Sequence, residues 1–328
     1  MAVVGLGWWG QRVIQDLSDS ASVVPVLAID PSSAARAAVA ESVPRTGADL
    51  SEALASPDVE AVVLCSPHRF HVEQVVATAR ASKHVFCEKP FASSGAPAEE
   101  ALGAVADSGV VLGIGHERRF EPGVAEIRDL VASGRLGRLL AFEGSFCQDK
   151  FLALDEQNWR ISATEAPVGP LSATGIHVMD LALSFLGEPD QASAHLSTQG
   201  TSFANGDTLG VQLRWTDGPV ALLTAVLATP FLGRICLYGT DGWAELRDRA
   251  HPESPAGWDL VVSLRGRAPV TTWIPPTSAV RANLDAWATA CLGGPGYPVS
   301  SAEILSNVRT YEAIVRSASS GNLVALRP

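Results

Sequence analysis

Three glycines near the N-terminus have the spacing of a pyrophosphate-binding turn. The run Gly5-Leu6-Gly7-Trp8-Trp9-Gly10 follows a short apolar segment and precedes a helix-like segment, residues 11–17. In this setting Gly5 permits a tight turn, Gly7 lets the backbone approach a pyrophosphate, and Gly10 lets the helix pack closely on the strand. The helix N-terminus then offers unpaired N–H groups and the positive end of its dipole to the phosphates. A glycine turn without a ligand is the alternative.

Asp30 ends the next apolar run and lies about 20 residues beyond the glycines, where a carboxylate accepts hydrogen bonds from the adenosine ribose hydroxyls. Pro31 follows it in place of an arginine, so a 2′-phosphate would meet a carboxylate without an adjacent cation. The pattern therefore predicts NAD in preference to NADP. Arg36 would weaken this preference if it reached back, and an ordinary helix cap is the alternative role for Asp30.

Glu88, Lys89 and Pro90 follow the apolar run His84–Cys87. They are expected at the carboxyl edge of a parallel sheet, where ligands bind in such folds. The chain has only three lysines among 24 basic residues, so a lysine at this place is unlike surface filler. Lys89 is therefore a candidate catalytic residue, and a structural ion pair is the alternative.

Residues 2–115 alternate short apolar runs with amphipathic segments. Apolar runs are expected as strands at Val23–Ile29, Val59–Cys65, His84–Cys87 and Val110–Ile114. Helices are expected between them at Pro31–Glu41, Phe70–Ala81 and Ala96–Ala106. This alternation predicts βαβ units, and hence a parallel sheet covered by helices on both faces.

Beyond Phe120 the pattern changes to longer alternating runs separated by turn signals. The runs expected to form antiparallel strands are Leu209–Trp215, Val220–Leu227, Arg234–Tyr238 and Trp243–Leu246. Helical patterns at Ala279–Leu292 and Ser301–Ser319 close the chain. The predicted division is a dinucleotide-binding domain, residues 1–117, and a second α/β domain for substrate binding and oligomerisation, residues 118–328.

Composition limits the classes of partner. The 328 residues carry a formal net charge of −11, which opposes binding to nucleic acid or to an anionic membrane. No apolar stretch reaches the roughly 20 residues needed to span a bilayer, and no secretory leader is evident, which favours the cytoplasm. The five cysteines form no C-x-x-C pair, so neither a disulfide framework nor a metal site is expected.

Several segments together resemble the Gfo/Idh/MocA family, which includes glucose-fructose oxidoreductase and inositol dehydrogenase. The resemblance covers nearly the whole chain. It rests on Gly5–Gly10, Ser66-Pro67 with His71, Lys83–Pro90, Gly115–Pro122, Gly134–Gly137, Trp159-Arg160 and Gly169–Asp180.

The resemblance implies a Rossmann dinucleotide-binding domain followed by an α/β domain with an open, mostly antiparallel sheet, and a homodimer or homotetramer. Lys89 resembles the lysine that contacts substrate and nicotinamide ribose, and His177 resembles the histidine that exchanges a proton with the reacting hydroxyl. The residues implied to bind the cofactor are Gly5, Gly7, Trp8, Trp9, Gly10, Asp30, Ser66, Pro67, His71, Glu88 and Lys89. Those implied to bind substrate are His116, Arg119, Trp159, Arg160, His177 and Asp180.

The implied activity is transfer of a hydride between nicotinamide and a hydroxyl-bearing carbon of a sugar, inositol or sugar acid. Histidine suits the accompanying proton transfer because its unperturbed pKa is closest to neutrality. The sequence departs from many family members at Ala173, where an aspartate is usual four residues before the histidine. Two alternatives therefore stay open: a hydrolase or lyase that retains NAD, and a non-catalytic dinucleotide sensor. The substrate itself is not indicated.

Overall fold

A computed structural model describes residues 1–20 and 22–326, and the chain divides into two compact units. The first comprises residues 1–117 and 278–308, and the second comprises residues 118–277 with the described part of 309–328. The structure differs from the predicted division in one respect, because residues 278–308 return to the first unit instead of belonging to the second. Helix α9 (Ser301–Ser320) begins in the first unit and ends in the second.

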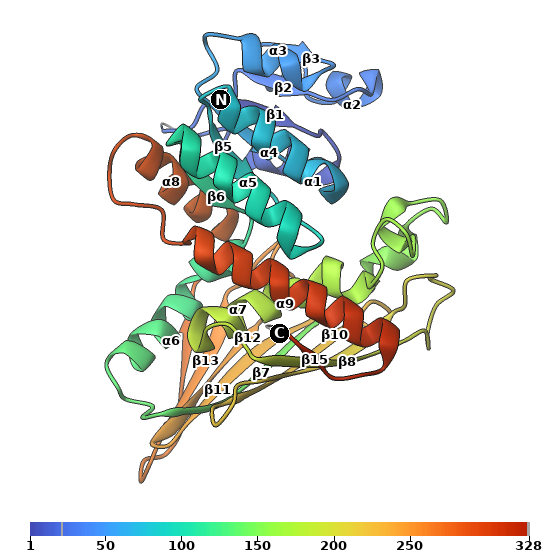
Figure 1. Cartoon of the computed structure of the whole chain (residues 1–328). Coiled ribbons are helices and arrows are strands. Elements are labelled where there is room, and N and C mark those ends of the chain that lie inside the picture. The colour runs from blue at the N-terminus through green and yellow to red at the C-terminus, as the bar shows by residue number, and fades with distance from the viewer. Residues whose placement is uncertain (21, 327–328) are drawn as a thin grey trace. The chain divides into compact units, whose positions relative to one another are not determined.

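The first unit is built on a six-stranded parallel sheet of order β3-β2-β1-β4-β5-β6 (Figure 1). Its strands are β1 (Ala2–Val4), β2 (Leu27–Ile29), β3 (Thr46–Gly47), β4 (Ala61–Leu64), β5 (His84–Cys87) and β6 (Leu112–Ile114). Its helices are α1 (Trp8–Asp16), α2 (Ser33–Ala37), α3 (Leu50–Ala55), α4 (His71–Arg80), α5 (Gly95–Ser108) and α8 (Ala279–Cys291), with a 3₁₀ turn at His68–Phe70. The strand order reverses between β1 and β4, which is where ligands bind in open α/β sheets.

Alternating strand residues of this sheet pack into two separate cores. Ala2 and Val4 lie in the core shared with α4 and α5, whereas Val3 between them lies in the core shared with α1 and α8. Successive side chains of a strand point to opposite faces, so both faces of this sheet are covered. This arrangement confirms the predicted doubly covered parallel sheet.

The second unit is built on a nine-stranded sheet of order β14-β13-β12-β11-β7-β10-β9-β8-β15. The strands are β7 (Leu139–Cys147), β8 (Gln191–Ser197), β9 (Thr208–Arg214), β10 (Val220–Val226), β11 (Leu232–Gly239), β12 (Gly242–Asp248), β13 (Trp258–Leu264), β14 (Val270–Ile274) and β15 (Val324–Ala325). The helices are α6 (Pro122–Ala132) and α7 (Ile176–Leu186), with 3₁₀ turns at Glu117–Phe120, Lys150–Ala153 and Trp159–Ile161 and a π-helical turn at Leu171–Gly175. Only β7 and β10 pair in parallel, so the sheet is mostly antiparallel, as predicted.

Among the described residues, helices cover one face of this sheet and no helix covers the other. Residues of α6, α7 and the second half of α9 share a core with inward side chains such as Phe142 and Leu223. The opposite face carries Leu222, 47% exposed, and an ion-pair network in which Arg234 contacts both Glu143 and Glu245. A large sheet with one uncovered face is typical of a fold that uses this face for association.

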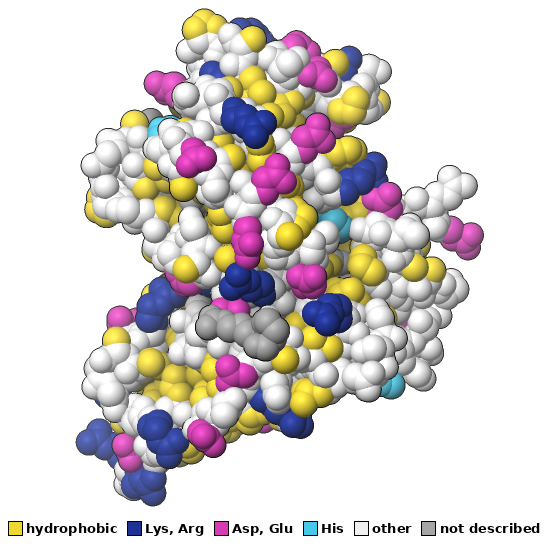
Figure 2. Space-filling view, in the orientation of Figure 1, with side chains coloured by type: hydrophobic (Ala, Val, Ile, Leu, Met, Phe, Trp, Pro, Cys, Tyr) yellow, Lys and Arg dark blue, Asp and Glu magenta, His cyan; other side chains and the backbone are white. Residues whose placement is uncertain are grey.

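The described residues contain no helix that is both long enough and apolar enough to cross a membrane. Acidic and basic side chains are interspersed over the face shown in Figure 2.

Candidate active site

The glycine turn after β1 is shaped by its neighbours. Gly5 has φ +88°, and a Cβ there would lie 2.6 Å from the backbone nitrogen of Ser66, at the adjacent end of β4. A Cβ on Gly10 would lie 1.9 Å from the Gly5 carbonyl oxygen, so this glycine lets α1 pack closely on the turn. A Cβ on Gly7 would meet nothing within 4 Å. Two glycines therefore serve packing, while the third leaves its backbone open to an approaching group.

The N-terminus of α1 is suited to an anion. Gly7 is its N-cap, no side chain caps it, and its first turn contains no acidic residue. Its first residue, Trp8, is 54% exposed, and the rings of Trp8 and Trp9 lie 5.3 Å apart. A helix start with uncapped N–H groups fits the pyrophosphate that the sequence pattern predicts.

Asp30, directly after β2, is tied to this turn. Its Oδ2 accepts a hydrogen bond from the Leu6 backbone nitrogen at 2.8 Å, and its Oδ1 accepts one from the Ser32 nitrogen at 2.8 Å. Arg36 does reach back, since its Nη1 donates to the carbonyl oxygens of Asp30 (2.7 Å) and Pro31 (3.1 Å). The carboxylate therefore also organises the local backbone, and a guanidinium lies against the backbone carbonyls that follow β2.

His71 lies inside the first unit. It is 1% exposed, and its ring nitrogens lie 2.7 Å from the Pro90 carbonyl oxygen and 2.9 Å from the Ser66 carbonyl oxygen. Burial lowers its pKa to about 4, so the ring is neutral at pH 7 and donates to one of the two carbonyls. The ring joins the chain after β4 to the Lys89-Pro90 turn, and the predicted cofactor contact of His71 stays a prediction.

Glu88 and Lys89 follow β5 at the same carboxyl edge. Glu88 is 7% exposed and its carboxylate packs against Gly115, where a Cβ would lie 2.3 Å from an oxygen. Burial raises the pKa of Glu88 to about 7, against an opposing effect of the adjacent Lys89. Lys89 is half-buried, whereas the nearby Lys83 is buried and donates to the carbonyls of Ser56 and Val59. Lys83 is thus held by backbone carbonyls in the manner of a structural residue.

In the second unit, His177 is the second residue of α7 and is 7% exposed. The π-helical turn that contains Ala173 leads directly into this helix. The His177 ring packs against Phe146 of β7 with 5.6 Å between ring centroids. Short π segments occur often at functional sites, because the wider turn redirects the side chains around it.

Arg119 and Asp180 pair with each other. The guanidinium Nε and Nη2 lie 2.8 and 2.7 Å from the two carboxylate oxygens, and the residues are 6% and 1% exposed. This bidentate geometry holds α7 to the segment before α6. Their charged ends face one another inside the protein, and the prediction that both contact substrate stays a prediction.

Trp159 and Arg160 form a half-buried pair in a short 3₁₀ turn. The Arg160 guanidinium lies 4.5 Å from the centre of the Trp159 ring, and burial lowers its pKa. Among the described residues no carboxylate pairs with this guanidinium. His116, also implied to bind substrate, belongs to the first unit and is 3% exposed.

Two further residues of the second unit lie close to Phe146, and no motif in the sequence marks them. His251 packs against Phe146 with 5.8 Å between ring centroids, and its Nε2 lies 2.7 Å from Oε1 of Gln148. The only available signal is the alternation along β7, which places Phe146 and Gln148 on one face. The described residues include no group of three His, Cys, Asp or Glu side chains placed to bind a metal ion.

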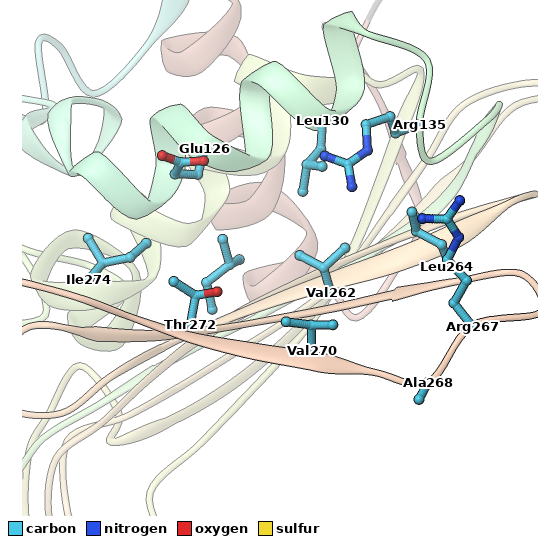
Figure 3. Close-up of a pocket in the computed structure, with 11 residues that line it drawn as sticks. Glu126, Leu130, Arg135, Val262, Leu264, Arg267, Ala268, Val270, Thr272 and Ile274 are labelled. Atoms are coloured by element: carbon cyan, nitrogen blue, oxygen red, sulfur yellow. The ribbon is translucent and has the colours of Figure 1, made fainter.

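A cavity of about 320 Å³ lies elsewhere in this unit, between α6 and the strands β13 and β14 (Figure 3). Leu130 of α6 lies across the cavity from Val262 and Ile274 of the strands, and Arg135 and Arg267 also line the cavity. None of the predicted site residues lines it.

Comparison with known proteins decides the family. Residues 1–116 match the sequence model of the Gfo/Idh/MocA oxidoreductases with an NAD-binding Rossmann fold, and residues 124–245 match that of a C-terminal domain of the same family. The chain belongs to the Gfo/Idh/MocA family. Its first unit is therefore the NAD-binding Rossmann domain of this family.

Curated relatives of this Gfo/Idh/MocA chain include dehydrogenases. A 4-carboxy-2-hydroxymuconate-6-semialdehyde dehydrogenase of Sphingobium sp. is 37% identical over 138 residues, which cover 42% of this chain and 44% of the relative. A levoglucosan dehydrogenase of Pseudarthrobacter phenanthrenivorans is 31% identical over 195 residues, which cover 58% and 50%. The match thus spans about half the length of these relatives.

A solved levoglucosan dehydrogenase in complex with NADH and levoglucosan has a TM-score of 0.85, with 22% identity. It covers 100% of this chain and 99% of that one, and it establishes the fold. The relatives' names agree with hydride transfer, and neither the hydrolytic nor the non-catalytic alternative finds support in them.

Proposed function

We propose that the protein is an NAD-dependent dehydrogenase or reductase that acts on a CH–OH group of a sugar, inositol or sugar acid. The observation that carries this is the gathering of the glycine turn, Asp30 and Lys89 at the carboxyl edge of one parallel sheet, next to its switch point. The family membership and the dehydrogenase relatives support the same reaction class.

The first unit fits the dinucleotide. The pyrophosphate would lie at the open backbone of Gly7 and the uncapped start of α1, with the adenosine ribose at Asp30. Ser66, Pro67 and Glu88 flank this edge, and Lys89 would contact the nicotinamide ribose and the reacting oxygen. Bound NAD would supply the hydride acceptor.

The second unit would supply the proton transfer and substrate contacts. His177 would accept the proton of the reacting hydroxyl, because a hydride can leave a carbinol carbon only if that proton also departs. Trp159 offers a flat apolar face for a sugar ring and Arg160 offers hydrogen-bond donors, while His116 of the first unit would offer a further donor. A half-buried guanidinium without a carboxylate partner among the described residues also suits a substrate oxyanion.

NAD is the preferred cofactor in this proposal. The Asp30 carboxylate would repel a 2′-phosphate and would accept hydrogen bonds from the ribose hydroxyls of NAD. The position of Arg36 reduces this preference, because its guanidinium provides positive charge beside the same strand end.

The proposed assembly is a homodimer or homotetramer that uses the uncovered face of the nine-stranded sheet. That face combines Leu222 with the Arg234 ion pairs, a mixture typical of association surfaces. The proposed location is the cytoplasm, which the five free cysteines fit.

The test is NADH production by the purified protein over a panel of D-xylose, levoglucosan, myo-inositol and D-galacturonate, with NAD and NADP in parallel. Saturable NADH formation from at least one of these compounds is expected. NAD binding without turnover on a widened panel of polyols and sugar acids would overturn the proposal in favour of a sensor. Substrate cleavage without net NADH would instead reveal a hydrolase or lyase.

A further inference from the structure

Gln148 directly follows β7 and lies on the face of the sheet that α7 covers. Its backbone nitrogen donates to the Val226 carbonyl, so the extended pairing of β7 with β10 continues through it. Side chains two residues apart in a strand share a face, so Gln148 is on the same side as Phe146. Phe146 in turn packs against His177. Gln148 therefore lies two residues along the strand from Phe146, whose ring packs against the proposed proton acceptor His177.

The amide of Gln148 has a defined orientation because His251 fixes it. The Glu253 backbone N–H donates to His251 Nδ1 at 3.2 Å, so Nδ1 must carry a lone pair. The proton of the neutral ring is then on Nε2, which donates to Gln148 Oε1 at 2.7 Å. Burial and the nearby Lys150 and Arg118 lower the pKa of His251 to about 4, which keeps the ring in this form at neutral pH.

This orientation turns the amide nitrogen of Gln148 away from His251. Gln148 is 6% exposed, and its Nε2 forms no hydrogen bond with any residue that the structure describes. This nitrogen is not among the fully buried side-chain atoms without a partner, so it stays accessible to a ligand that provides an acceptor. Phe146, Phe231 and His251 form an aromatic cluster, and Gln148 contacts a ring nitrogen of this histidine.

We infer that Gln148 is a further substrate-binding residue, whose amide N–H groups donate to an acceptor oxygen of the polyhydroxylated substrate, and that His251 is its positioning residue. The inference rests on the proposed function, because it concerns the same substrate. A hydroxyl or ring oxygen close to the reacting carbon would be the group recognised. The amide would favour substrates that carry this oxygen over those that lack it, because a substrate without the oxygen would leave the amide N–H groups without an acceptor.

The experiment compares three variants on the best substrate of the panel, with Gln191→Met as the matched control on β8. Gln148→Met keeps the length of the side chain and removes its hydrogen bonds, and we expect KM to rise about 3- to 10-fold with kcat changed less. Gln148→Glu keeps the acceptor for His251 but removes the donors, and we expect a larger rise, of more than about 10-fold. The Kd for NADH, measured by fluorescence, should stay within about 2-fold of the wild-type value.

His251→Phe tests the positioning role, because it keeps an aromatic ring beside Phe146 and Phe231. It should raise KM in the wild-type background and have no further effect in the Gln148→Met background, because His251 would act only through Gln148. Additive effects of the two substitutions on KM would overturn the positioning role. A KM for Gln148→Met equal to that of Gln191→Met would overturn the inference while leaving the proposed dehydrogenase intact.

If the protein is not a dehydrogenase, the experiments give a result that differs from failure of the Gln148 inference alone. If the wild type forms no NADH, binding of D-xylose, levoglucosan and myo-inositol to the NADH-loaded protein is measured by calorimetry. Binding that weakens in Gln148→Met would retain the inference without the reaction. Absence of both turnover and saccharide binding would overturn both proposals.

Discussion

The carboxylate of Asp30 accepts a hydrogen bond from the Leu6 backbone nitrogen, with 2.8 Å between the two atoms. The residue predicted to select the cofactor therefore also holds the glycine turn that would bind the pyrophosphate. These two roles are not alternatives, because each carboxylate oxygen has more than one lone pair. The structure places Ser32 and not Asp30 at the N-cap of α2, so the structural role of Asp30 is to order the turn, and a side chain with that role can also bind a ribose.

We expect Asp30→Ala to reduce the preference for NAD over NADP by about 10-fold or more, because it removes the charge that opposes a 2′-phosphate. The free energy of unfolding should fall by about 1 kcal/mol, since two backbone N–H groups lose their acceptor. Titrations with both cofactors and urea unfolding measure these effects. Asp49→Ala, which removes the N-cap of α3 in the same unit, is the control for stability without cofactor selection. An unchanged cofactor ratio in Asp30→Ala would leave Asp30 with only its structural role.

Two lysines close together in the sequence should respond differently to substitution. Lys89→Ala is expected to lower turnover by about 10²-fold or more with a Kd for NAD within about 3-fold of wild type, because this lysine would act on the reacting oxygen. Lys83→Met should instead lower the melting temperature, because it removes a buried ammonium hydrogen-bonded to Ser56 and Val59. Steady-state rates and thermal unfolding separate the two. Full turnover by Lys89→Ala, where chemistry limits the rate, would refute its proposed role.

Glu88 should make stability depend on pH. Burial raises its pKa to about 7 in the folded chain, whereas the ordinary value is 4.5. Between these values the folded chain binds more protons than the unfolded chain, so a rise in pH lowers the free energy of unfolding. The contribution is fully present below pH 4.5 and is lost as the pH rises through 7, and it amounts to roughly 3 kcal/mol.

Urea unfolding of wild type and Glu88→Gln at pH 5, 6, 7 and 8 measures this contribution. Relative to wild type, the variant should gain stability as the pH rises. His71 has the opposite pH dependence, because its lowered pKa costs stability as the pH falls from 6.5 towards 4. It is present in both proteins, so it cancels in their difference. Glu100→Gln, an exposed carboxylate on α5, should show no such gain, and parallel pH curves for wild type and Glu88→Gln would contradict the prediction.

The sequence predicted most of the first unit because its strands are short apolar runs whose ends carry the site. Strand β5 was expected at His84–Cys87 and has those bounds. The helix expected at residues 31–41 is confined to Ser33–Ala37, because Ser32 caps it but no apolar stripe extends it. Strand β7 was missed: Phe142 and Phe146 alternate with Glu143 and Ser145, but Gly144 between them has low strand propensity and weakens this pattern.

The parts of the site that could not be predicted depend on tertiary contacts. Arg119 and Asp180 are 61 residues apart, and in the sequence each has the charge and the position within its motif that are expected of a pocket residue. Their pairing inside the protein is set by the packing of α7. His251 lies 103 residues from Gln148, in a loop without a recognisable motif. Similarly, nothing in Leu171–Gly175 distinguishes a π-helical turn from the start of an α-helix.

The last prediction concerns His177 and the missing carboxylate at Ala173. A histidine can act as a general base without a carboxylate partner, although its orientation and its charged form are less well supported. Packing against Phe146 and the rigid start of α7 supply orientation in this chain. We therefore expect His177→Ala to reduce turnover by about 10²- to 10⁴-fold where chemistry limits the rate.

Ala173 is half-buried, so Ala173→Asp should be tolerated there. Its negative charge would raise the pKa of the histidine, which must lose its proton to act, and would shift the activity optimum to higher pH. The pH dependence of turnover for wild type and both variants on one substrate decides this. Superimposable profiles of equal height for wild type and His177→Ala would show that the proton goes to another group.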